Sequence, residues 1–204
     1  MKKILIASTN PGKITEIKIG LHELKKQGIK ILTLNDVIVG ENQPEETGKT
    51  FQENALIKAK FYANLTHVPV ISDDGGLVIP YLNNEPGVKS RRWLGYAASD
   101  QELVDHTLKR LQNIPKLNRK AYLEACLCFY DPQTNEVIYE TEKIIGHISE
   151  ASVLKIIPGF PYRALLIVDK FNKCYDELTK EEHQQINHRL IALKRLTKRI
   201  KDLI

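Results

Sequence analysis

The sequence predicts a single α/β domain that spans residues 1–204. Strand-like apolar runs alternate with helical segments, and no repeat, low-complexity tract or Pro/Ser-rich linker divides the chain. A chain of 204 residues can bury enough apolar surface for one core without disulfide or metal staples. Its 42% hydrophobic and 27% charged residues are ordinary for a soluble globular protein.

The chain opens with a strand, a polar turn and a helix. Residues 3–7 form a continuous apolar run, which is typical of a buried strand, and residues 8–13 form the turn. From Ile14 to Leu24, apolar residues recur at helical spacing, so we expect one helix there. Residues 29–34 predict a second strand.

A capped helix and a strand with two carboxylates follow. Thr50 and Glu53 have the spacing of a capping box, so a helix is expected to begin there, with Lys58 near its middle. Residues 69–72 predict a short strand that ends at the Asp-Asp-Gly-Gly run of residues 73–76. We expect the backbone to become flexible at this run, and strand ends of this kind commonly carry functional sites.

The second half of the chain continues the alternation. Ser99 with Glu102 predicts a capped helix, and Thr179 with Glu182 predicts a long terminal helix that continues to Ile200. Further strands, including one hairpin, are predicted at residues 77–82, 121–130, 137–145 and 165–168.

The cysteines and the N-terminus indicate a cytoplasmic protein, and the charge distribution bears on nucleic-acid binding. Lys and Arg outnumber Asp and Glu by 30 to 25. The excess gathers in the last helix, where a solvated helix face explains it better than nucleic-acid binding, so no specific nucleic-acid partner is expected. The three cysteines are odd in number and lack CxxC spacing, and the N-terminus does not resemble a signal peptide. No apolar stretch approaches the roughly 18 residues that span a membrane.

The first polar turn is a candidate phosphate site. Ser8, Thr9, Asn10, Gly12 and Lys13 place hydroxyls, an amide, a glycine and an ammonium at a helix entrance, where phosphate oxygens are commonly held. The spacing differs from that of a P-loop, and a capped structural turn is the alternative.

Two acidic pairs are candidate metal ligands. Glu45 and Glu46 precede the capped helix, and Asp73 and Asp74 follow a strand. Their carboxylates could converge on a hard cation, and Mg²⁺ is the natural candidate because it prefers oxygen ligands and phosphates. Turn formation and solvation are the alternative.

Polar groups near the C-terminus could form a base pocket. His183, His188 and Arg189 lie close together on the expected terminal helix, and Phe160 and Tyr162 lie in an earlier turn. Histidine and arginine supply donors that suit the 6-keto acceptor of a purine and leave an adenine amino group facing donors. The alternative is the polar side of an amphipathic helix.

In their order and content these elements resemble the inosine triphosphate pyrophosphatases, a family that hydrolyses non-standard purine nucleoside triphosphates. The resemblance covers nearly the whole chain. Its elements lie at residues 8–13, 45–48, 50–55, 72–77, 86–91, 177–179 and 188–189.

The resemblance implies a two-lobed single domain with a long mixed β-sheet flanked by helices, a nucleotide cleft between the lobes, and a homodimer. It also implies hydrolysis of ITP, dITP and XTP to monophosphate and pyrophosphate, which cleanses the nucleotide pool.

The resemblance also assigns roles to residues. Residues 8–13 and Lys58 contact the triphosphate. Glu45 and Asp74 bind magnesium, and Asp74 activates water, with Asp73 open as an alternative ligand or supporting group. By the same resemblance, the base is held by Phe160, His188 and Arg189.

The chain departs from the family pattern mainly at residues expected to contact the base. Gly75 stands where the family has serine, Arg163 where it has an acidic residue, His183 where it has lysine and Asn187 where it has serine. A charge reversal beside a bound nucleotide can alter which base is accepted. The alternatives to a standard enzyme are a homologue with altered base specificity and a nucleotide-binding protein with little turnover. The retained carboxylates and lysines favour an enzyme.

Overall fold

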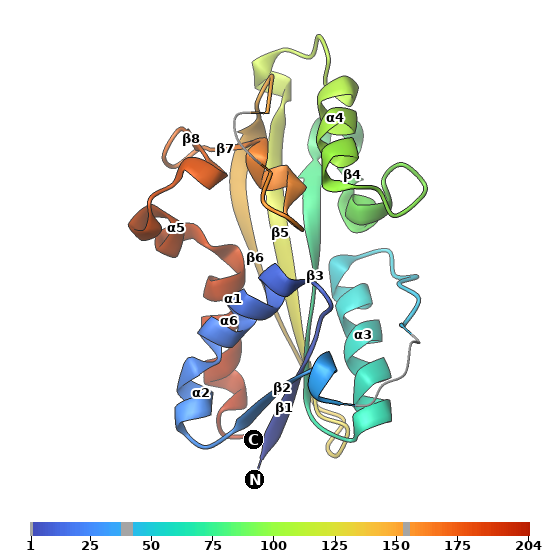
Figure 1. Ribbon diagram of the computed structural model, residues 1–204, viewed down its shortest axis with the longest axis vertical. Helices are drawn as coiled ribbons and strands as arrows, with labels where there is room; N and C mark the ends of the chain where they lie inside the picture. The colour runs from blue at the N-terminus through green and yellow to red at the C-terminus, as the bar shows by residue number, and fades with distance from the viewer. Residues whose placement is uncertain (1, 38–42, 153–155) are drawn as a thin grey trace. The chain divides into compact units, whose positions relative to one another are not determined.

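A mixed β-sheet organises the chain (Figure 1). The computed structural model describes residues 2–37, 43–152 and 156–204. Over these residues the strands are β1 (Lys3–Ala7), β2 (Lys30–Thr33), β3 (Val70–Ile79), β4 (Glu85–Pro86), β5 (Lys120–Tyr130), β6 (Val137–Ile148), β7 (Leu166–Val168) and β8 (Lys173–Cys174). Their order is β2-β1-β3-β5-β6-β7-β8, with β4 beside β3. β1 pairs in parallel with β2 and β3, whereas β3–β4, β6–β7 and β7–β8 are antiparallel. The predicted α/β class and mixed sheet are therefore confirmed.

Helices and short 3₁₀ turns connect the strands. The helices are α1 (Pro11–Gly20), α2 (His22–Lys26), α3 (Phe51–Thr66), α4 (Asp100–Arg110), α5 (Lys180–Ile186) and α6 (His188–Ile200). The 3₁₀ turns are η1 (Leu34–Asp36), η2 (Pro80–Leu82), η3 (Gly87–Arg92), η4 (Lys116–Asn118), η5 (Pro161–Ala164) and η6 (Tyr175–Glu177). The expected capping boxes begin α3, α4 and α5. No helix in these segments is long and apolar enough to cross a membrane.

The elements form two compact units. Unit 1 comprises Met1–Asp74, Ala125–Glu142 and His188–Ile204, and unit 2 comprises Gly75–Glu124 and Lys143–Asn187. The long strands β3, β5 and β6 contribute residues to both units. The single domain and the cleft between two lobes stay predictions.

In unit 1 the sheet carries helices on both faces: α1, α2 and α6 on one, α3 on the other (Figure 1). Ile4 and Ile6 of β1 share a buried cluster with Ile17 of α1 and Leu193 of α6. Leu5 between them is also fully buried, and strand alternation directs it to the opposite face. This three-layer arrangement places the start of α1 and the middle of α3 and β3 around the candidate site.

Unit 2 has its own core. Leu77 and Ile79 of β3 pack with Leu103 of α4, Ile144 of β6 and Tyr175 of η6 in one buried cluster. Unit 2 therefore buries the second half of β3 in an apolar environment of its own.

Two expected helices are each broken by one residue. The segment from Ile14 to Leu24 divides at Leu21, which has φ −90° and ψ 6°, and the terminal segment divides at Asn187, where ψ is 101°. A ψ of 101° is extended, so the helix cannot continue through Asn187 and begins again at His188. Apolar spacing is hardly affected by a one-residue break, which explains why the sequence predicts continuous helices.

The strand that was expected to end at residue 72 instead continues as β3 to Ile79. The prediction that the backbone becomes flexible at residues 73–76 is therefore wrong. One reason is that Gly76 lets Ser90 approach the strand, so that the hydroxyl of Ser90 accepts a hydrogen bond from the backbone N–H of Leu77 at 3.0 Å. Glycine here permits close packing.

Replacing Gly76 by Ala is expected to destabilise the protein by about 1–3 kcal/mol, because the new Cβ would overlap the side chain of Ser90. Urea denaturation measures the loss. Adding Ser90→Gly to the variant removes the overlapping atoms and is expected to recover part of it, whereas an unchanged midpoint for Gly76→Ala alone would contradict the packing explanation.

The cysteines and the basic C-terminus have structural explanations. Cys126, Cys128 and Cys174 are buried thiols, and burial raises the pKa of Cys128 to about 12. On α6, Arg195 forms ion pairs with Glu140 and Glu142 of β6, at 2.7 and 2.6 Å. These ion pairs partly neutralise the positive charge of α6 with carboxylates of the sheet.

Candidate phosphate and carboxylate site

The turn after β1 is a capped helix entrance. The side-chain oxygen of Asn10 accepts hydrogen bonds from the backbone N–H groups of Gly12 and Lys13, at 2.9 and 3.1 Å. Ser8 Oγ accepts the N–H of Asn10 at 3.2 Å, and Thr9 is exposed. The capped-turn alternative therefore describes this turn, and a phosphate could bond these N–H groups only by displacing the Asn10 side chain. The Lys13 side chain extends from the turn to β3.

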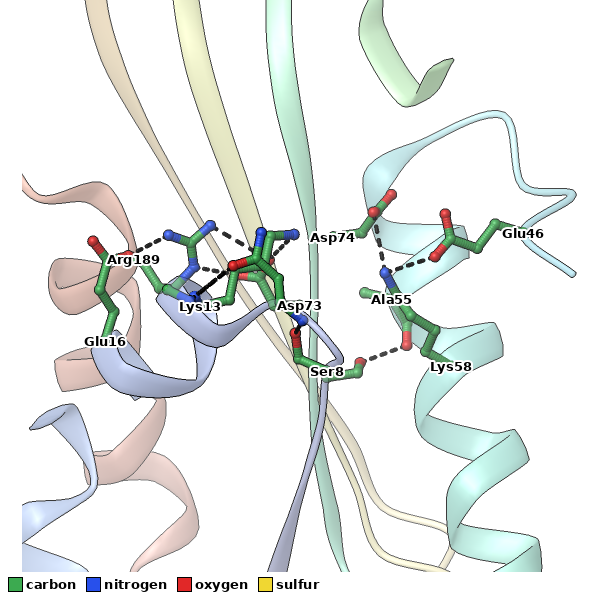
Figure 2. Close-up of polar contacts among 12 residues, drawn as sticks. Ser8, Lys13, Glu16, Glu46, Ala55, Lys58, Asp73, Asp74 and Arg189 are labelled. Carbon is green, nitrogen blue, oxygen red and sulfur yellow. Dashed lines mark hydrogen bonds and ion pairs between the residues drawn. The ribbon is translucent and has the colours of Figure 1, made fainter. Parts of the chain in front are cut away.

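The two carboxylates of β3 lie on opposite faces of the strand, because successive side chains alternate. Asp73 shares its face with Ile71, which packs among α1 and α6. Asp74 shares its face with Ser72, whose hydroxyl donates to the backbone carbonyl of Ala55 in α3 at 2.5 Å. Figure 2 shows Asp73 directed toward Lys13 and Arg189, and Asp74 toward Lys58. The adjacent carboxylates thus belong to two separate networks.

Asp73 is the centre of a buried, balanced network. It accepts hydrogen bonds from Nε and Nη2 of Arg189 at 2.6 and 3.4 Å, and its Oδ1 lies 2.5 Å from Lys13 Nζ. Arg189 Nη1 also pairs with Glu16. Burial favours the neutral acid, but Arg189 and Lys13 outweigh it and hold the pKa of Asp73 well below its usual range. Two cations balance two carboxylates, so this network is electrically neutral.

Asp74 belongs to a network with excess negative charge. Lys58 Nζ lies 3.1 Å from Asp74 Oδ1 and 3.0 Å from Glu46 Oε1. The other oxygen of Asp74, Oδ2, is buried and has no hydrogen-bond partner among the described residues. Burial raises the pKa of Asp74, and Glu46 adds to this effect against the opposing influence of Lys58 and Lys13. Counted alone, the charged forms of Lys58, Asp74 and Glu46 sum to −1.

The acidic residue that reaches this network is Glu46. Glu45, which the sequence indicated as a metal ligand, is exposed, whereas the Glu46 side chain is 26% exposed and pairs with Lys58. No group of three or more His, Cys, Asp or Glu side chains that could hold a metal ion occurs in the described part of the chain. The expected gathering of Asp73 and Asp74 on one ion is disfavoured by their opposite directions.

The aromatic turn in unit 2 holds Arg163 in a stack. The guanidinium lies 3.6 Å from the ring centroid of Phe160 and 4.8 Å from that of Tyr175. Tyr162 is buried, and its hydroxyl donates to the backbone carbonyl of Ser90 at 2.6 Å. Arg163 is thus buried between Phe160 of this turn and Tyr175 of η6. Nearby, burial raises the pKa of Asp176 to about 6 despite the lowering influence of Arg163.

The remaining predicted base-pocket residues lie in both units. In unit 2, His183 contacts the ring of Tyr175 edge-on, with centroids 4.8 Å apart. In unit 1, His188 is buried at the start of α6, and Arg189 faces Asp73 and Glu16. Gly75 is the half-buried residue that follows Asp74 in β3.

Sequence reasoning gave no role to Glu16, although it lies one helical turn after Lys13, a spacing at which the two side chains share a face of α1. It gave the metal-ligand role to Glu45 rather than to Glu46, the residue that pairs with Lys58. The spacing of Glu16 was a usable signal, whereas the choice between adjacent loop carboxylates had none.

These features define an α/β protein whose β3 carries two carboxylates: Asp73 pairs with cations from α1 and α6, and Asp74 pairs with one cation from α3. The same fold occurs in the Staphylococcus aureus Ham1 protein, with a TM-score of 0.84, 30% identity and full coverage of both chains. It also occurs in a HAM1 protein from Coxiella burnetii, with a TM-score of 0.85, 31% identity, and coverage of 99% of this chain and 100% of that one.

Sequence comparison gives the family. The model of the Ham1 family matches residues 4–199, and the chain therefore belongs to the Ham1 family. The dITP/XTP pyrophosphatase of Wigglesworthia glossinidia brevipalpis is 38% identical over 99% of this chain and 98% of its own length. The dITP/XTP pyrophosphatase of Bacillus subtilis (strain 168) is 36% identical over 97% of this chain and 96% of its own length. The family resemblance drawn from the sequence is confirmed.

Proposed function

We propose that this protein hydrolyses non-standard purine nucleoside triphosphates of the dITP and XTP class to nucleoside monophosphate and pyrophosphate. The observation that carries the proposal is Asp74, whose Oδ2 is buried without a partner among the described residues while Lys58 holds Oδ1. Full-length similarity to proteins named dITP/XTP pyrophosphatases supports the substrate class.

The lysines would bind the triphosphate. Lys13 and Lys58 enter the site from α1 and α3 and end on opposite sides of β3 (Figure 2). Phosphoryl transfer depends mainly on positioning and charge neutralisation, which two ammonium groups provide without a covalent intermediate. Both lysines are paired with carboxylates, so a triphosphate would compete with Asp73 and Asp74 for them.

Asp74 and Glu46 would hold the divalent cation, which we propose is Mg²⁺. They fit it because their carboxylate oxygens are its preferred donors, their network has net negative charge, and Asp74 Oδ2 is unpartnered among the described residues. Asp73 fits poorly, because Arg189 and Lys13 already occupy both of its oxygens. When bound, the ion would neutralise charge that develops on the phosphates.

Asp74 is also the proposed general base. A carboxylate deprotonates water best when its pKa approaches the working pH, and burial raises the pKa of Asp74 toward that range. A carboxylate of this kind is unnecessary in a protein that only binds nucleotides, which favours turnover.

We propose that Phe160, Tyr162, Arg163, His183 and His188 contribute to base recognition, and that 6-keto purines are preferred. Arg189 supports this role less well than the sequence indicated, because its guanidinium is committed to Asp73 and Glu16. We further propose that the protein is a cytoplasmic homodimer. Light scattering of the purified protein measures its molar mass in solution and so tests the dimer.

Pyrophosphate release from ITP, XTP, GTP, ATP and a pyrimidine triphosphate tests the substrate class. We expect turnover only with Mg²⁺ and a preference for ITP and XTP. Turnover that survives a chelator, or equal rates with ATP, would reject the proposal.

The variant Arg163→Asp tests the proposed base-recognition residues. It removes the guanidinium that covers Phe160, and we expect the ratio of kcat/KM values between ITP and GTP to shift by about tenfold, the effect of roughly 1.4 kcal/mol. Lys170→Asp is the control, since Lys170 also lies over an aromatic ring of unit 2 but is exposed. Identical substrate profiles in both variants would remove Arg163 from base selection.

A further inference from the structure

Lys58 lies where two carboxylates converge. Its ammonium is 3.1 Å from Asp74 Oδ1 and 3.0 Å from Glu46 Oε1, and its side chain is only 13% exposed (Figure 2). The ammonium pairs with the same carboxylate oxygens that a divalent cation with a preference for oxygen ligands would bind.

The charges around Lys58 keep it protonated. Burial lowers the pKa of the ammonium, but Asp74, Glu46 and Asp73 outweigh burial and raise it above the usual lysine value. Lys58 is therefore a charged ammonium at neutral pH. Lys58 faces two carboxylates, whereas Lys13 and Arg189 together face Asp73 and Glu16.

We propose that the Lys58 ammonium occupies the cation position between Asp74 and Glu46, so that a divalent cation enters only when a triphosphate draws Lys58 away from the carboxylates. This inference rests on the proposed function, since it assumes that the site receives both ligands. A cation that arrives alone must displace Lys58 without offering it a new anion. A cation that arrives with a triphosphate supplies that anion, and each ligand therefore strengthens binding of the other.

If Lys58 served only to hold α3 against β3, its removal would displace α3. The contact from the Ser72 hydroxyl to the Ala55 carbonyl, at 2.5 Å, joins α3 to β3 independently of Lys58. Removal of the ammonium should therefore leave α3 in place and increase the negative charge that faces an incoming cation.

The test measures Mn²⁺ binding to the nucleotide-free protein by electron paramagnetic resonance. Lys58→Met is expected to bind Mn²⁺ about tenfold more tightly than the natural protein, because one positive charge next to the site is removed. The same variant is expected to bind metal-free tripolyphosphate, measured by calorimetry in EDTA, about tenfold more weakly. The opposite signs of these two changes distinguish cation replacement from general damage.

Three further variants complete the test. Lys60→Met removes an exposed lysine of the same helix and should change neither affinity. Lys58→Arg keeps the charge and should leave Mn²⁺ binding weak, and Lys58→Gln replaces the methionine variant if that variant does not fold. Mn²⁺ affinity that is unchanged or weaker without the Lys58 charge overturns the inference, even if the enzyme is active. Tighter Mn²⁺ binding supports it, even if no nucleotide is hydrolysed, so the two proposals fail separately.

Discussion

Replacing Asp74 by Asn is expected to lower kcat by about 10²- to 10⁴-fold, the usual contribution of a general base. Asparagine has nearly the same shape and can still accept a hydrogen bond from Lys58, so the folded protein should persist. What is lost is the negative charge and the capacity to take a proton from water. Pyrophosphate release from ITP under saturating Mg²⁺ measures the effect.

The pH profile gives this prediction its second readout. Asp74 must be ionised to act, and burial raises its pKa above the usual aspartate value, so the rate should rise as pH increases through that raised pKa and then level off. The residual activity of Asp74→Asn should lack this rise. A variant with natural kcat, or with the natural acidic limb, would assign the chemistry to another residue.

Replacing Arg189 by Met is expected to destabilise the protein by about 3–5 kcal/mol, the usual cost of removing one partner from a buried ion pair. The change leaves the fully buried Asp73 and the partly buried Glu16 without their shared cation. Urea denaturation at neutral pH measures the loss. Arg195→Met is the matched control, because Arg195 lies on the same helix and also forms ion pairs, but its side chain is 41% exposed. Loss of Arg195 should cost about 0–1 kcal/mol.

Acid titration of stability tests the same network. The pKa of Asp73 is lower in the folded protein than in the unfolded chain, so its contribution is complete above the unfolded pKa near 4 and is lost as pH falls below it. In Arg189→Met the folded pKa moves back toward the unfolded value, and this part of the acid dependence should shrink. Equal losses for Arg189→Met and Arg195→Met would show that the buried network adds little.

The sequence predicted the fold class better than the functional geometry, and β3 shows why. Treating Asp73-Asp74-Gly75-Gly76 as a flexible strand end left the two carboxylates unranked. Once the strand continues, its alternation sends Asp73 to the face of α1 and α6 and Asp74 to the face of α3. Glycine is compatible with both flexibility and close packing, and the close approach of Ser90 to Gly76 favours close packing here.

Contacts between distant residues explain the other differences. Arg189 pairs with Asp73, which is 116 positions away, and with Glu16, which is 173 positions away, so helical spacing alone could not separate a base contact from a buried ion pair. The capping boxes, by contrast, depend on residues three positions apart and were predicted correctly.

The depth of the three thiols has a practical consequence for labelling. Cysteine reagents attack the thiolate, and burial raises the pKa of Cys128 and Cys174, while Cys126 is only 1% exposed. The cysteines of the natural protein should therefore not react with maleimides under native conditions. A cysteine introduced at an exposed lysine, such as Lys25 in unit 1 or Lys116 in unit 2, would carry a fluorophore or spin label by itself, with the natural cysteines left in place.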